Sequence, residues 1–118
     1  MLIAVALSIG LLSACNAKAD ETTAATSQGT SNEDVIVRTF MFDPSPLHVE
    51  TGTTVTWTDR DRIDHTITSG TPKDPSGTFD GSLPHEGATF TFRFDEPGTY
   101  PYFCRIHNVM RGEIVVSA

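Results

Sequence analysis

Three segments of the chain alternate apolar and polar residues with a period of two. Leu and Val alternate with His and Glu over residues 47–50, Val and Trp alternate with Thr over 54–58, and Phe alternates with Thr and Arg over 89–94. Such alternation is typical of β-strands that bury one face, because successive side chains of a strand point to opposite sides. No stretch has the spacing of an amphipathic helix. Since strands with one apolar face must share a core, we predict an all-β domain.

Further short apolar segments extend this pattern. The additional candidate strands cover residues 35–40, 65–69, 77–80, 98–104 and 112–117. Pairs that favour turns separate them, at Asp43-Pro44, Thr51-Gly52, Asp74-Pro75 and Pro97-Gly98. About eight short strands in one small domain predict a two-sheet antiparallel β-sandwich with Greek-key connections. Any helix would have to lie within residues 71–87.

The N-terminal part of the chain is expected to lie outside the folded domain. Residues 1–14 form an apolar run followed by small residues, too short to span a bilayer and typical of a signal peptide, although no Lys or Arg precedes Cys15. Leu12-Ser13-Ala14-Cys15 resembles the lipobox of bacterial lipoproteins, which predicts a lipid anchor at Cys15. Residues 15–34 lack aromatic side chains and are predicted to be a disordered tether. The folded domain is then 35–118, held to a membrane in an extracytoplasmic location, periplasmic or at the cell surface.

Length and charge restrict the partners. The 118 residues leave room for one modest core, and we expect a monomer. The formal net charge is −7 and the isoelectric point is near 4.8. A nucleic-acid partner is disfavoured, because binding to phosphates requires clustered Lys and Arg. An acidic surface is compatible with a basic protein partner.

Cysteine, histidine and methionine recur at short spacing after residue 100. Cys104, His107 and Met110 form a C-x2-H-x2-M motif between two predicted strands, so the three side chains can face one ion. Soft sulfur together with imidazole selects copper, whereas structural zinc favours several thiolates or imidazoles and calcium favours oxygen ligands. If Cys15 carries lipid, Cys104 is left without a disulfide partner. The motif therefore predicts a copper site.

A second histidine would complete such a site. His65 opens a predicted strand directly after the polar loop 59–64, which we interpret as solvated, and its side chain can reach the end of a sandwich. His85, in a predicted loop, is the reserve ligand, and His48 is expected to face solvent. Two histidines and a cysteine with a weak axial methionine form the blue-copper arrangement. The predicted ligands of one copper ion are His65, Cys104, His107 and Met110.

These residues give the chain a resemblance to the cupredoxins of the plastocyanin, amicyanin and pseudoazurin group, over essentially all of residues 35–118. The matching segments are 52–57, the strand that begins at His65, 98–100 and the loop 104–110. The resemblance implies a single type 1 copper and outer-sphere electron transfer with redox proteins. It also implies that His107, between Ile106 and Val109, is the electron port.

Two residues depart from the pattern of this group. Thr66 stands where asparagine commonly follows the first histidine and helps to link the two ligand loops. A threonine hydroxyl could provide that hydrogen bond instead. Asn108 stands where a proline is common, which predicts a less rigid ligand loop.

Two further functions compete with electron transfer. A copper protein could deliver or buffer Cu(I) without redox turnover, but such proteins more often use exposed Met-rich or paired-Cys sites. A multicopper oxidase or copper nitrite reductase would need two or more domains, and a trinuclear cluster would need His-x-His pairs, which the sequence lacks. We therefore predict an electron carrier and not an enzyme.

Overall fold

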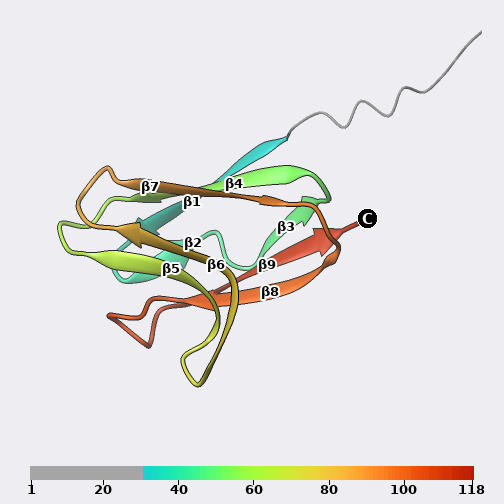
Figure 1. The fold of residues 1–118 in the computed structure, drawn as a ribbon. Helices are drawn as coiled ribbons and strands as arrows, with labels where there is room; N and C mark the ends of the chain where they lie inside the picture. The colour runs from blue at the N-terminus through green and yellow to red at the C-terminus, as the bar shows by residue number, and fades with distance from the viewer. Residues whose placement is uncertain (1–30) are drawn as a thin grey trace, which may run out of the picture.

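The computed structural model describes residues 31–118, which form nine β-strands (Figure 1). Their bounds are β1 Asn32–Arg38, β2 Met41–Asp43, β3 Leu47–Glu50, β4 Thr53–Asp59, β5 His65–Thr71, β6 Asp74–Leu83, β7 Thr89–Phe94, β8 Gly98–Phe103 and β9 Arg111–Ser117. Within this part of the chain, no helix is long and apolar enough to cross a membrane. The expected signal peptide, Cys15 and most of the expected tether lie outside the described residues.

The strands form two sheets that face each other, which confirms the predicted β-sandwich. One sheet has four strands in the order β2-β1-β4-β7, and the other has five in the order β3-β9-β8-β5-β6 (Figure 1). The sheets are not wholly antiparallel, because β1 pairs with β4 in parallel and β3 pairs with β9 in parallel. Each sheet is therefore mixed.

The first predicted strand differs from the observed structure at both ends. The strand begins at Asn32, earlier than the expected start at residue 35, because residues 32–34 pair with β4 from Thr54 onwards. It ends at Arg38, and a turn at Thr39 and Phe40 reverses the chain into β2. The segment predicted as one strand over 35–40 thus belongs to a hairpin.

The core lies between the sheets and is rich in aromatic rings. Trp57 of β4 is fully buried, and its ring centroid lies 5.5–5.7 Å from those of Phe79, Phe90 and Tyr102. The predicted Phe stripe of β7 also belongs to this cluster, with Phe94 buried and the other two phenylalanines partly buried. The period-two pattern thus identified the side chains that join the sheets.

The region left open for a helix instead contains the turn and the second strand of a β-hairpin, followed by a loop. β5 and β6 pair antiparallel, and Thr71 lies opposite Asp74, so the turn consists of Pro72 and Lys73 and not of the predicted Asp74-Pro75 pair. Gly70 has a φ of 98°, and a Cβ atom there would lie 2.4 Å from the backbone nitrogen of Ser76. Glycine is required at this position because both the backbone conformation and the close approach exclude a side chain.

Candidate metal centre

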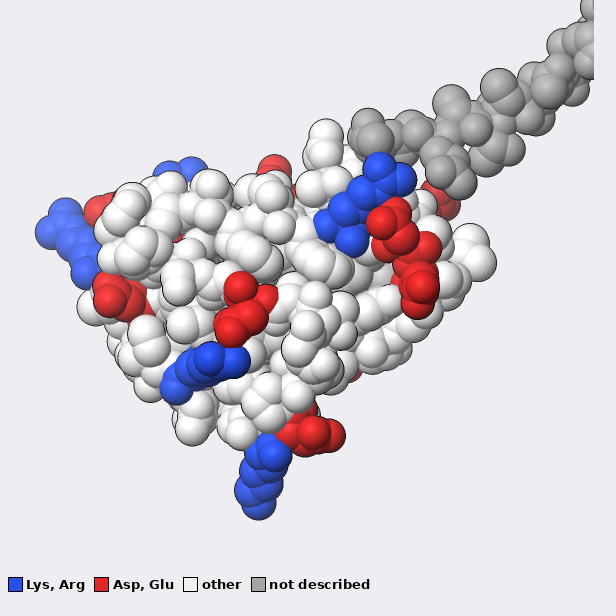
Figure 2. Space-filling view, viewed as in Figure 1, with Lys and Arg blue, Asp and Glu red and all other residues white. Residues whose placement is uncertain are grey.

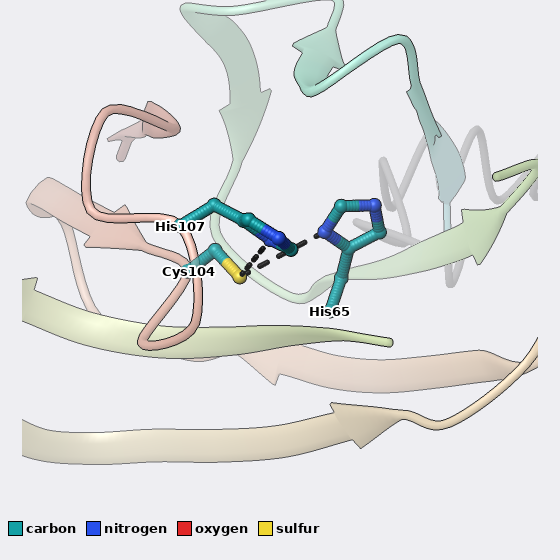
Figure 3. Close-up of side chains that lie close together, drawn as sticks. All are labelled: His65, Cys104 and His107. Atoms are coloured by element: carbon teal, nitrogen blue, oxygen red, sulfur yellow. Dashed lines mark hydrogen bonds between the residues drawn. The ribbon is translucent and has the colours of Figure 1, made fainter. Parts of the chain in front are cut away.

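The structure brings together the cysteine and both histidines of the predicted site (Figure 3). His65 is the first residue of β5, Cys104 directly follows β8, and His107 lies in the loop between β8 and β9. The Cys104 Sγ atom lies 3.8 Å from Nδ1 of His65 and 3.7 Å from Nδ1 of His107. One thiol and two imidazole nitrogens thus face one another at one end of the sandwich.

Burial differs among the predicted ligands. Cys104 is fully buried and His65 is 1% exposed, whereas His107 is only half-buried. Met110 is buried, and backbone hydrogen bonds fold the loop so that its carbonyl accepts a bond from the Cys104 N–H (3.2 Å). The backbones of Met110 and Cys104 are therefore in contact, and the role of Met110 as a fourth ligand stays a prediction.

The other two histidines lie outside this group. His48 is exposed on β3, as expected. His85, the reserve ligand, is exposed in the loop between β6 and β7 and pairs through Nδ1 with the carbonyl oxygen of Glu86 at 3.0 Å. The candidate metal-binding group of His65, Cys104 and His107 includes neither of them.

Thr66 links the two segments that carry the predicted ligands. Its backbone N–H donates to Cys104 Sγ (3.4 Å), and its hydroxyl oxygen accepts a hydrogen bond from the backbone N–H of Arg105 (2.8 Å). The threonine hydroxyl thus provides the hydrogen bond between the two ligand segments that asparagine commonly provides in this group. Hydrogen bonds of this kind orient metal ligands and adjust their electron density.

Replacing Thr66 with valine is expected to lower the free energy of unfolding of the copper-free protein by about 1 kcal/mol, because the Arg105 N–H loses its acceptor. The shape of the side chain is kept, so packing changes little. Chemical denaturation measures the effect, and Thr66→Ser, which keeps the hydroxyl, is the control. Equal stability of the valine variant and the wild type would show that the link contributes nothing.

Asp61 holds the second ring nitrogen of His65, a contact that the sequence analysis did not foresee. Its Oδ2 atom lies 2.9 Å from His65 Nε2. Because an ionised carboxylate can only accept, the hydrogen bond runs from the Nε2–H group of His65 to Asp61 Oδ2. This arrangement fixes the ring orientation and leaves Nδ1 free for a metal.

The acidic loop is less solvated than predicted. Asp59 is fully buried, and burial raises its pKa, an effect opposed by a hydrogen bond from the backbone N–H of Asp61. Burial also acts to raise the pKa of Asp61, but hydrogen bonds from two backbone N–H groups and from the His65 ring hold that pKa below its usual value. Asp61 is therefore ionised at neutral pH and can act as an acceptor.

The donor set fits copper. A buried thiol and two imidazole nitrogens, all within 4.8 Å of one another, combine the soft and borderline ligands that copper prefers. Closed structural zinc sites more often use several thiolates or imidazoles at four tetrahedral positions. A two-sheet β-sandwich with such a donor set at one end defines the class of small copper-binding β-sandwich proteins.

Comparison with known proteins gives the family. The model of the copper-binding proteins of the plastocyanin/azurin family matches residues 30–117. Plastocyanin of Scenedesmus fuscus is 36% identical over 85 residues, which cover 65% of this chain and 87% of that protein. Amicyanin of Paracoccus denitrificans is 32% identical over 76 residues, covering 64% of this chain and 58% of that protein.

Solved structures agree with this result. A purple cupredoxin from Nitrosopumilus maritimus superposes with a TM-score of 0.67 and 29% sequence identity, and the match covers 72% of this chain and 99% of that protein. The chain belongs to the plastocyanin/azurin family of copper-binding proteins. It is a cupredoxin with a copper cofactor, and it is an electron-transfer protein rather than an enzyme.

Proposed function

We propose that this cupredoxin is a blue, type 1 copper protein that carries single electrons between redox proteins outside the cytoplasm. The observation that supports it most is the convergence of Cys104 Sγ with Nδ1 of His65 and of His107. These three side chains would hold the copper, with Met110 as the weak axial ligand. The bound copper would supply a change between Cu(I) and Cu(II).

The protein's part in this chemistry is to keep the ligands in one arrangement. Asp61 fixes the His65 ring, and Thr66 donates to the Cys104 sulfur and links its loop to β5. Cys104 and His65 are buried, so water is kept from these ligands. A rigid ligand set lowers the rearrangement that accompanies each electron, because little has to move.

An apolar rim at the metal centre would receive the redox partner. It consists of three exposed side chains: Phe40, whose ring contacts both histidines, and Ile106 and Val109 in the loop that holds His107. On the face drawn in Figure 2, basic side chains instead lie beside acidic ones. Arg105, which follows Cys104 in the sequence, pairs with Asp80 at a nitrogen–oxygen distance of 2.9 Å. Apolar surface beside a half-buried ligand is suited to a brief protein contact.

Replacing Val109 with aspartate is expected to slow electron self-exchange between reduced and oxidised copies by about tenfold, because a charge on the rim must be desolvated on contact. Val109 is 87% exposed, so the fold should be unaffected. NMR line broadening in mixtures of the two redox states measures the rate. Thr91→Asp, which adds the same charge on β7, is the control, and an equal rate in both variants would contradict a role for the rim.

Membrane attachment is the remaining part of the proposal. The sequence supports a signal peptide over residues 1–14, a lipid at Cys15 and a tether that leads to the folded domain. Under this proposal the domain is a monomer, held near its redox partners by the tether. Mass spectrometry of the protein recovered from membranes would detect the lipid on Cys15, and a Cys15→Ser variant should be released.

Repeated redox cycling tests the proposed function. The full chain loaded with Cu(II) is reduced with ascorbate and reoxidised with ferricyanide while a Cu(I) chelator, bicinchoninate, is present. An electron carrier should regain its full blue absorption after every cycle. Transfer of the copper to the chelator in the first reduced state would instead indicate a protein that delivers copper.

A further inference from the structure

The turn between β1 and β2 has an unusual backbone. Thr39 has a φ of 52° and Phe40 a φ of 59°, which places two consecutive residues other than glycine in the left-handed region. This region is unfavourable for residues with a Cβ atom, above all for a β-branched residue such as threonine. The turn is also exposed, so core packing alone does not hold it. Another interaction must stabilise it.

A single carboxylate provides that interaction. Asp61 accepts a hydrogen bond from the Thr39 N–H at Oδ1 (2.9 Å) and one from the Phe40 N–H at Oδ2 (3.3 Å). The same Oδ2 atom accepts the bond from His65 Nε2 (2.9 Å). The Asp61 side chain is 15% exposed and the His65 side chain is fully buried, so the carboxylate lies between the exposed turn and the buried ring. One side chain therefore connects the turn to a histidine of the metal centre.

The turn places an aromatic ring against both histidines. The Phe40 ring centroid lies 5.0 Å from that of His107 and 6.0 Å from that of His65, with interplanar angles of 86° and 90°. Edge-to-face contacts of this kind are favourable for aromatic pairs. Phe40 is 50% exposed, so its ring contacts the two imidazoles and is also in contact with solvent.

We propose that Asp61 is a positioning residue that joins the His65 ring to the Thr39–Phe40 turn and thereby keeps Phe40 as a cover over both histidines. In this arrangement, the carboxylate orients a ligand and also limits the access of small molecules to the site. Phe40 covers the site only while the turn keeps its left-handed conformation. The part that concerns copper rests on the function proposed above, whereas the coupling between the three residues does not.

NMR of the copper-free full chain tests the coupling. The wild type should show nuclear Overhauser effects from the Phe40 ring to the rings of His65 and His107, and a slowly exchanging His65 Nε2 proton. In Asp61→Ala both signals should be lost, and in Asp61→Asn, which offers one oxygen in place of two, they should be weaker than in the wild type. Asp64→Ala, at an exposed aspartate of the same loop, is the matched control and should resemble the wild type.

Access to the metal gives a second, independent readout. Azide has its own absorption band when it binds Cu(II), and the loaded wild type should not show this band. Both Asp61→Ala and Phe40→Ala should show it, but only Asp61→Ala should lose the protected His65 proton. This difference separates the cover from the residue that positions it.

The outcomes are distinct. Unchanged Phe40 contacts in both Asp61 variants would overturn the inference. It would also be overturned if the Asp64→Ala control bound azide as well as Asp61→Ala does. A wild type that binds Cu(II) without a blue band would refute the proposed function, and the measurements on copper-free protein would still decide the coupling. If Asp61→Ala does not fold, the comparison of Asp61→Asn with Phe40→Ala decides.

Discussion

The Cys104→Ser variant is expected to show no intense blue absorption when Cu(II) is added, whereas the wild type should turn blue with one copper per chain. The intense band of a type 1 site arises from charge transfer between a thiolate sulfur and Cu(II), so it requires this sulfur. Cys104 is the one free cysteine among the residues that the structure describes, and it faces Nδ1 of both histidines. The predicted effect is the complete loss of the band, measured by visible spectroscopy.

The substitution is conservative enough for this test. Serine has nearly the shape of cysteine, and the hydrogen bond from the Thr66 N–H has an oxygen acceptor in place of sulfur. Near-ultraviolet circular dichroism of both copper-free proteins checks that the fold is kept. A blue band of wild-type intensity in Cys104→Ser would place the copper elsewhere and refute the assignment of the site.

The Trp57→Ala variant is expected to lose about 3–5 kcal/mol of unfolding free energy. Trp57 is fully buried between the sheets, and its neighbours are large rings, Phe79, Phe90 and Tyr102, which cannot fill the cavity without losing their own contacts. The total free energy of unfolding of a small domain is about 5–15 kcal/mol, so this loss is a large part of its stability. Urea denaturation of the copper-free protein measures it.

Trp57→Phe is the control for this prediction. It keeps an aromatic ring against the same neighbours and removes less volume, so its loss should be clearly smaller than that of the alanine variant. If the alanine variant lost less than about 1 kcal/mol, Trp57 would not be the centre of the core.

Much of the fold follows from local patterns in the sequence. The alternation in β4 and β7 predicted their buried faces, because a period of two is a property of the strand itself. The parallel pairs β1 with β4 and β3 with β9 were not foreseen, since they join segments that are distant along the chain. The hairpin of β1 and β2 was missed because Thr39 and Phe40 carry none of the usual signals of a left-handed turn.

The metal centre was predictable where its residues share a short motif. Cys104 and His107 were found from their spacing, and His65 from its place at the start of a strand after a polar loop. Asp61 could not be found in the same way, because an aspartate in a loop with several charges is usually solvated. Its function depends on a turn that approaches from another strand pair, which no local spacing reveals.

The position of β9 determines when the metal centre can form. This strand lies between β3 and β8 in the five-stranded sheet, yet it comes after the ligand loop along the chain. In a partly folded chain in which β9 has not yet paired, the strand before Cys104 therefore lacks one of its neighbours, although all four predicted donors precede β9 in the sequence. Copper uptake should thus follow the completion of folding, and a chain cut before Arg111 should expose its thiol to oxidation and not capture the metal.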